Sequence, residues 1–351
     1  MPPAPASPQA WPRPPAWQRG GHRQTIAAAL WAARSPEPLP PWQRQRWFTP
    51  DDDFIDADLR VPPHPQGAVV LFHGLEGSSC SHYAQALAWV AWRRGWAVIV
   101  PHFRGCSGEP NRAARAYHSG DHAEVDWMLA RAAALTAGLP LWAVGVSLGG
   151  NALLRWLQEQ GERARQRLRA AAAVSAPLDL VAAGAAIDRG LNRWLYARHF
   201  LRTMRDKAAE MARRHPQRLE VQRAVRARTL RAFDDAFTAP LHGFAGVDDY
   251  WRRASSRPQM DRIALPTLVL NARNDPFVPA ASLPQPHEVG PWVRLWQPLQ
   301  GGHVGFAEPR HVGDVRGQVW GLWQHVLDWL QAAAALPSGP AAGQAAEVRH
   351  G

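Results

Sequence analysis

Three residues that each follow a predicted strand could together form a nucleophilic site: Ser147, Asp275 and His303. Ser147 lies in the pattern Gly145-x-Ser147-x-Gly149, between an apolar run at 141–146 and a stretch with helical apolar spacing. Small residues around a serine are typical of a tight strand-to-helix turn, which exposes the hydroxyl above the carboxyl edge of a sheet. Such a serine can attack an acyl carbonyl once a base removes its proton.

The predicted acid and base occupy equivalent positions after two later strands. Asp275 follows the apolar run 266–271 in a turn bounded by prolines, and His303 lies in the glycine-rich segment 301–306 after the last predicted strand. Because the carboxyl ends of parallel strands share one edge of a sheet, both side chains can reach Ser147. We therefore expect His303 to accept the serine proton while Asp275 orients the imidazole.

A second glycine-rich loop supplies the predicted site for the developing negative charge. The apolar run 68–72 ends in His73-Gly74-Leu75-Glu76-Gly77-Ser78-Ser79. The backbone N–H groups of Leu75 and Leu148 are the expected oxyanion hole, because both lie where an acyl oxygen would face the serine. We interpret His73 as a residue that shapes this loop rather than as a base.

Alternating strands and helices must position these residues. Apolar runs typical of buried strands occur at 68–72, 97–100, 141–146, 171–175, 266–271 and 292–296, and a hairpin is predicted at 46–59. Helical apolar spacing separates most of these runs, and a closing helix is predicted near 319–330. The pattern predicts an α/β fold, with a mostly parallel sheet flanked by helices.

Residues 179–256 break this alternation, since they show helical spacing and no strand. We expect a helical lid insertion over the sheet edge. It is strongly basic: residues 189–231 contain thirteen arginine and lysine residues but three acidic ones, in a chain of net charge +11. A basic helical surface can contact anionic lipid, so a lipid-surface binding protein is a competing class, and a solvated face is the simpler interpretation. Aromatic residues that could stack on bases are sparse there, so we do not expect nucleic acid.

The ends of the chain differ from its centre. Residues 1–20 are proline-rich and residues 337–351 are rich in alanine, glycine and proline, so both are predicted to be disordered around one main domain at 21–336. Cys80 and Cys106 are too few for a disulfide framework, and no signal peptide or membrane span is evident, so we expect a cytoplasmic protein. No metal or cofactor is expected, because no His-Glu-x-x-His spacing or cysteine cluster occurs.

From about residue 21 to residue 330, the chain resembles the YheT-like branch of the α/β-hydrolases. The matching segments are Gly21-His-Arg-Gln-Thr25, residues 73–79, Phe103-Arg-Gly-Cys-Ser-Gly-Glu109, Asn111-Arg112, Tyr117-His-Ser-Gly120, Gly145-Val-Ser-Leu-Gly-Gly-Asn151, Pro240-Leu-His-Gly-Phe244, Asn274-Asp-Pro-Phe277 and Gly301-Gly-His-Val-Gly-Phe306. The resemblance implies the α/β-hydrolase fold and a carboxylesterase-type hydrolase of small-molecule or lipid acyl esters, whose triad falls on Ser147, Asp275 and His303.

Eukaryotic members of that branch act on medium-chain acyl esters or phospholipids, and some transfer the acyl group to an alcohol. Hydrolysis and acyl transfer share one acyl-enzyme and differ only in the second nucleophile. Both reactions are therefore open at this point.

Overall fold

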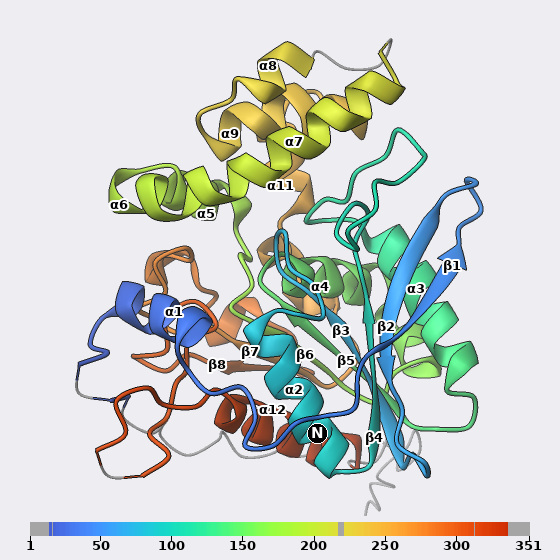
Figure 1. The fold of residues 1–351 in the computed structure, drawn as a ribbon, viewed down its shortest axis with the longest axis vertical. Coiled ribbons are helices and arrows are strands. Elements are labelled where there is room, and N and C mark those ends of the chain that lie inside the picture. Colours follow the sequence, from blue (N-terminus) through green and yellow to red (C-terminus); the bar gives the residue numbers. More distant parts are fainter. Residues whose placement is uncertain (1–13, 16, 217–220, 312, 336–351) are drawn as a thin grey trace, which may run out of the picture.

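The computed structural model describes residues 14–15, 17–216, 221–311 and 313–335 of the 351-residue chain. Within them an eight-stranded sheet has the order β1-β2-β4-β3-β5-β6-β7-β8 (Figure 1). Strands β3 to β8 run parallel, while β1 and β2 form an antiparallel hairpin at one edge. The predicted mostly parallel sheet flanked by helices is confirmed.

The observed strands coincide with the predicted apolar runs. Their bounds are β1 Gln43–Phe48, β2 Phe54–Arg60, β3 Gly67–Phe72, β4 Trp96–Pro101, β5 Leu141–Val146, β6 Ala171–Val174, β7 Thr267–Leu270 and β8 Val293–Trp296. All residues of β3, β4 and β5 are buried, as expected for central parallel strands covered on both faces.

Helices cover the two faces of the sheet. Strand alternation sends Val69 and Leu71 of β3 into one apolar core and Val70 and Phe72 into the other. The first core lies under α2 His82–Arg93 and α12 Trp320–Ala334, and the second under α3 His122–Leu135 and α4 Leu148–Gln160. A further helix, α1 Gly21–Leu30, precedes the sheet in sequence.

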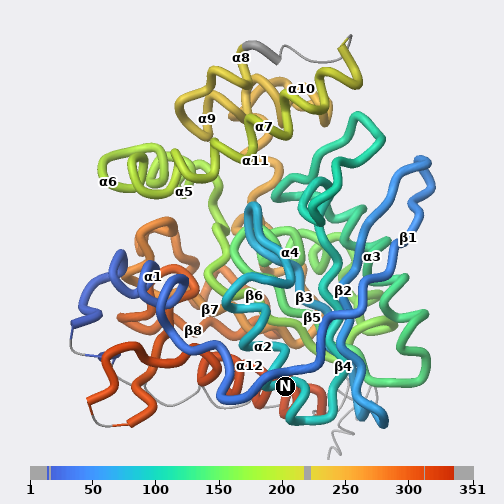
Figure 2. The backbone as a smooth tube through the Cα atoms, viewed as in Figure 1, coloured from blue at the N-terminus to red at the C-terminus, as the bar shows by residue number. Residues whose placement is uncertain are grey.

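Between residues 179 and 256, after β6, the described chain forms helices and no strand. They are α5 Leu180–Ile187, α6 Gly190–Asn192, η2 Arg193–Ala197, α7 Arg198–Arg214, α8 Val221–Val225, α9 Leu230–Phe233, η3 Asp234–Thr238, α10 Ala239–Leu241 and α11 Val247–Ala254. This segment, called the helical insertion below, lies over the carboxyl ends of the strands (Figures 1 and 2). Asp179 caps α5 by accepting a hydrogen bond from the N–H of Ala182.

One buried amide fixes the end of the helical insertion to the sheet layer. Asn151 in α4 donates from Nδ2 to the carbonyl oxygens of Ser119 and Ala254, both at 2.8 Å. Its Oδ1 accepts from the N–H of Ser256 at 3.1 Å. Since Asn151 itself is fully buried, these bonds replace water as its partners and join the insertion to the helix that follows Ser147.

Two residues just before α1 contact the segment at residues 315–316, while the disorder predicted for residues 1–20 stays a prediction. Gln18 is fully buried and donates from Nε2 to the carbonyl oxygen of Arg316, and the Trp17 indole donates to that of Val315. Residues 1–13 and the predicted tail 337–351 lie outside the described residues. No helix in the described part of the chain is both long and apolar enough to span a bilayer, and the cytoplasmic location stays a prediction.

Asp234 is a partly buried acidic residue in the helical insertion, and its carboxyl group gives a stability prediction. Burial raises its pKa to about 6, although Thr238 Oγ1 and Trp251 Nε1 donate to it at 2.7 and 2.9 Å. The folded state then binds the proton more tightly than the unfolded chain, so stability falls as pH rises from about 4 to about 6. We expect the stability of Asp234→Asn not to fall with pH in this way. The melting temperature of the variant should therefore rise relative to that of wild type across that pH interval. A difference that does not change with pH would contradict this.

Candidate active site

The turn at Ser147 has the strained geometry that its glycine pattern predicts. Ser147 has φ 52° and ψ −122°, a backbone conformation that non-glycine residues rarely adopt. Its N–H donates to the carbonyl oxygen of Val174 at 2.9 Å. A Cβ on Gly145 would lie 2.5 Å from the carbonyl oxygen of Gly149, and one on Gly149 would lie 2.4 Å from that of Phe72. Only glycine fits at either position, and the turn therefore packs directly against the end of β3.

The structure brings Ser147, Asp275 and His303 together. His303 Nε2 lies 3.0 Å from Ser147 Oγ, and His303 Nδ1 lies 2.8 Å from Asp275 Oδ2. The Asp275 side chain is fully buried, and its other oxygen accepts from the N–H groups of Phe277 and Val278 at 2.7 and 3.3 Å. With its Nδ1 proton held by this carboxylate, the imidazole presents Nε2 as an acceptor to the serine hydroxyl.

Helix α1 holds the His303 loop in place, a role that sequence reasoning missed. Thr25 Oγ1 accepts from the His303 N–H at 2.9 Å, and Asn274 Oδ1 accepts from the Gly302 N–H at 3.0 Å. Asn274 Nδ2 in turn donates to Gln24 Oε1 at 2.8 Å. The segment 21–25 appeared in the sequence only as a motif of the resemblance, with no role attached.

Leu75 and Leu148 line the same cavity as Ser147. Leu148 is the first residue of α4, so its N–H has no acceptor within the helix. Within the described residues, the N–H of Leu75 has no hydrogen-bond acceptor either. A Cβ on Gly74 would lie 3.1 Å from Ser147 Cβ, so the loop runs close to the serine. These donors can serve an acyl oxygen there.

His73 has a structural place beside this loop. Its ring is buried, and its Nε2 accepts from the N–H of Phe103 at 3.0 Å. Burial lowers the pKa of His73 to about 3, helped by the nearby His102. The ring is therefore neutral at physiological pH and joins the loops that follow β3 and β4.

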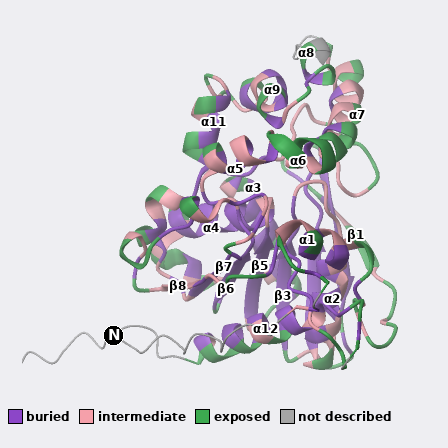
Figure 3. Ribbon diagram, turned by 90° about the vertical axis from the view of Figure 1, so that its left-hand side faces the viewer, coloured by how far each residue is buried: buried purple, intermediate pink, exposed green. Residues whose placement is uncertain are grey.

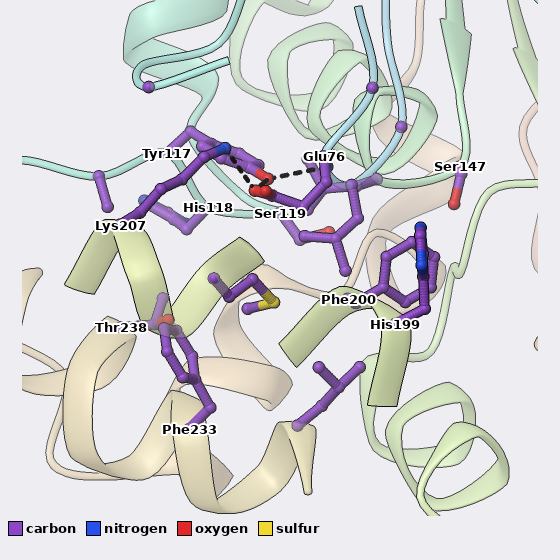
Figure 4. A pocket seen from close by; sticks show the side chains of 18 of the residues that line it. Glu76, Tyr117, His118, Ser119, Ser147, His199, Phe200, Lys207, Phe233 and Thr238 are labelled. Atoms are coloured by element: carbon purple, nitrogen blue, oxygen red, sulfur yellow. Dashed lines mark hydrogen bonds and ion pairs between the residues drawn. The ribbon is translucent and has the colours of Figure 1, made fainter. Parts of the chain in front are cut away.

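A cavity of about 960 Å³ separates the Ser147 edge of the sheet from the helical insertion. Figure 4 shows Ser147 at one side of it, with His199 and Phe200 of the insertion across the space. The insertion contributes mainly apolar side chains to the wall; they are Leu180, Ile187, Leu195, Phe200, Met204, Met211, Leu230, Phe233 and Phe237. Among the described residues, no group of three or more His, Cys, Asp or Glu could hold a metal ion.

An ion pair joins helix α7 to the loop that carries Leu75 (Figure 4). Lys207, the only lysine of the chain, places Nζ 2.7 Å from Glu76 Oε1. Tyr117 completes the contact, because its hydroxyl donates to Glu76 Oε1 at 2.8 Å and accepts from the Glu76 N–H at 3.0 Å. Glu76 has φ 56°, so this strained residue is bonded through both its backbone and its carboxylate.

The sheet order, the turn after β5 and the residue matches identify the class of protein. The model of the α/β hydrolase fold family matches residues 67–309, and the chain belongs to this family. Its sequence is 39% identical over 88% of the chain to the "Putative esterase YheT" of Escherichia coli (strain K12), 89% of which is covered. The predicted YheT-like character is thereby confirmed.

More distant relatives and solved structures share the fold. The phospholipase ABHD3 of Mus musculus is 29% identical over 75% of this chain, which spans 62% of that protein. The Pyrococcus furiosus esterase Pf2001 superimposes with a TM-score of 0.52 at 17% identity, covering 87% of this chain and 98% of its own. A bacterial membrane phospholipase A gives the same TM-score at 16% identity, covering 84% and 87%.

The Thr25 contact gives a test of the support beneath His303. We expect Thr25→Val to lower kcat for p-nitrophenyl acetate about tenfold, because a loss of about 1.4 kcal/mol in barrier stabilisation has that effect. The substitution keeps the shape of the side chain; it removes the acceptor of the His303 N–H and the local bond that the hydroxyl donates to the carbonyl oxygen of Gly21. Thr203→Val, on the exposed face of α7, is the matched control and should keep full activity. Equal rates for both variants would exclude a positioning role for Thr25.

The Lys207–Glu76 pair gives a separate test of the loop that carries Leu75. We expect Lys207→Met to lower kcat for the same ester more than it raises KM, because a displaced N–H donor weakens binding of the transition state more than that of the substrate. Arg213→Met, in an exposed position of the same helix, should change neither parameter. An unchanged kcat for Lys207→Met would show that the oxyanion site does not depend on this contact.

Proposed function

We propose that the chain is a serine carboxylesterase that cleaves acyl esters through an acyl-enzyme on Ser147. The observation that carries this proposal is the contact of His303 Nε2 with Ser147 Oγ at 3.0 Å, while its Nδ1 meets the buried Asp275 carboxylate at 2.8 Å. This arrangement opens into a largely apolar cavity, which is what an acyl-transfer site requires.

In the proposed reaction, Ser147 Oγ attacks the acyl carbonyl carbon while His303 Nε2 takes the hydroxyl proton. The N–H groups of Leu75 and Leu148 hold the carbonyl oxygen as it becomes negative. The bond to the alcohol oxygen then breaks, and His303 returns its proton to that oxygen. A water molecule, deprotonated by His303 in the same way, attacks the acyl-enzyme and releases the carboxylic acid. Asp275 stabilises the imidazolium in both halves.

The cavity supports an acyl chain as the part of the substrate that the helical insertion receives. Its apolar wall can remove an alkyl chain from water, at about 0.8 kcal/mol for each buried methylene. Relatives of the chain are named as a phospholipase, as a monoacylglycerol lipase and as a medium-chain ester synthase/esterase. We accordingly propose a small-molecule or lipid acyl ester as the substrate and the helical insertion as a lid.

Acyl transfer to an alcohol is the second candidate reaction. It is favoured by the similarity to the Saccharomyces cerevisiae medium-chain fatty acid ethyl ester synthase/esterase 2. That protein is 29% identical over 79% of this chain, and the match spans 65% of its own length. An alcohol would replace water in the attack on the acyl-enzyme, with His303 again taking the proton. Product analysis of p-nitrophenyl octanoate turnover with and without ethanol separates the reactions, because only transfer yields ethyl octanoate.

The proposed nucleophile is tested by labelling with a fluorophosphonate, which reacts with activated serines. We expect Ser147→Ala to lose labelling and ester hydrolysis together, at an unchanged melting temperature. His303→Ala should cost nearly as much as Ser147→Ala, since the three residues act as a unit, and Asp275→Asn somewhat less but still orders of magnitude. Full labelling of folded Ser147→Ala protein would place the nucleophile elsewhere.

A further inference from the structure

The cavity reaches the surface between helix α1 and the start of the helical insertion. Ile26 and Leu30 of α1 line the cavity together with Leu195 of η2, and Leu30 and Leu195 are also exposed to solvent. His22 and Tyr196 join the two elements, with stacked rings and a hydrogen bond of 3.2 Å. Figure 3 shows α1 and α6 on one face of the molecule, one above the other. This opening is called the mouth below.

Large apolar side chains project around the mouth. Leu30 and Trp31 at the end of α1 are 66% and 54% exposed, and Leu191 and Trp194 across the mouth are 56% and 70% exposed. With Leu195, these residues form what we call the apolar rim. Single exposed apolar residues need no explanation, but a group that borders a substrate cavity marks an interaction surface. The exposed lining residues at another part of the cavity, such as Glu109 and Arg214, are charged instead.

Arginines accompany the apolar rim on the insertion side. Arg189, Arg193, Arg198 and Arg202 are exposed, and none forms an ion pair with a carboxylate among the described residues. We call these four the arginine flank. No acidic residue occurs in the sequence between Arg189 and Asp206. Asp188, just before this segment, interacts electrostatically with Arg193, but its carboxylate bonds to the N–H groups of Leu230 and Arg231. Most of the positive charge of the arginine flank is therefore available to an external partner.

Several of the more C-terminal arginines of the basic segment are engaged within the protein, although Arg226 and Arg228 are exposed and form no ion pair with a described carboxylate. Arg213 and Arg214 both pair with Glu210, and Arg223 pairs with Asp235, while residue 218 lies outside the described residues. Within the basic stretch 189–231, the structure thus favours the part near the mouth over Arg213, Arg214 and Arg223 as a lipid-facing surface.

We propose that the apolar rim and the arginine flank form a docking surface for a bilayer that contains anionic phospholipid. Tryptophan side chains favour the boundary between headgroups and acyl chains, and arginines near an anionic membrane each contribute about 1 kcal/mol. Docked in this way, the mouth faces the acyl chains of the lipid layer. Passage of substrate from that layer into the cavity rests on the proposed function, whereas the docking itself does not.

The experiment is flotation of the full chain with vesicles of phosphatidylcholine alone or with 30% phosphatidylglycerol. The triple variant Trp31→Ser/Leu191→Ser/Trp194→Ser removes apolar side chains that do not line the cavity. We expect it to bind the mixed vesicles at least about tenfold more weakly than wild type and to hydrolyse p-nitrophenyl acetate at the wild-type rate. The control Phe48→Ser/Leu135→Ser removes two equally exposed apolar residues away from the mouth and should bind as wild type.

A charge series completes the test. Replacing the arginine flank by glutamine should abolish the preference for mixed vesicles, and 0.5 M salt should do the same to wild type because ions screen the attraction. Replacing Arg213, Arg214, Arg218 and Arg223 by glutamine should have little effect. The proposal would be overturned if wild type and the triple serine variant bound vesicles equally. It would also be overturned if binding were lost only when Arg213, Arg214, Arg218 and Arg223 were replaced.

Two further outcomes are distinguishable. Ser147→Ala protein should bind vesicles as wild type does, so that failure of the proposed catalysis leaves the docking result intact. If the wild type self-associated without binding vesicles, and the triple serine variant did not self-associate, the apolar rim would be a protein interface. That result would also overturn the proposal.

Discussion

The close packing of the Ser147 turn against the end of β3 is the constraint on which the site depends. It places the serine, Leu148 and the loop after β3 within contact of one another, and it excludes any side chain at Gly145 and Gly149. This close packing holds Ser147 in a strained backbone conformation with positive φ, and such a conformation costs about 1–3 kcal/mol for each non-glycine residue. Apart from Asp52 in the turn between β1 and β2, the described non-glycine residues with positive φ follow strands at the same edge of the sheet: Glu76, Ser147, Ser175, Val304 and Phe306.

Sequence patterns sufficed for the strands and for the order serine, acid, histidine, because both rest on local rules. Alternation and apolar runs encode burial, and residues after parallel strands share an edge whatever the length of chain between them. The support for His303 was not predictable in this way. Thr25 lies 278 residues from His303 along the chain, and a lone threonine near the start of a helix carries no signal for that contact.

Charged residues show the same limit. Arg104 and Glu109 carry opposite charges and lie close together in sequence, but Arg104 bonds to Asp53 and Glu124, and Glu109 bonds to Arg46. A charge pattern shows that partners are needed without showing which residues supply them. The same holds for Gln18, whose burial on the segment near Arg316 could not follow from a proline-rich composition.

The distribution of arginine bears on the origin of the basic charge. A bias in genome composition would add arginines wherever the surface tolerates them, and it would not sort them by partner. In the helical insertion the arginines nearest the mouth lack carboxylate partners among the described residues, while Arg213, Arg214 and Arg231 are paired; the exposed Arg226 and Arg228 also lack such a partner. The unpaired set also coincides with the exposed Leu191 and Trp194. Composition alone does not account for this coincidence of unpaired arginines and exposed apolar side chains, whereas the proposed docking on an anionic surface does.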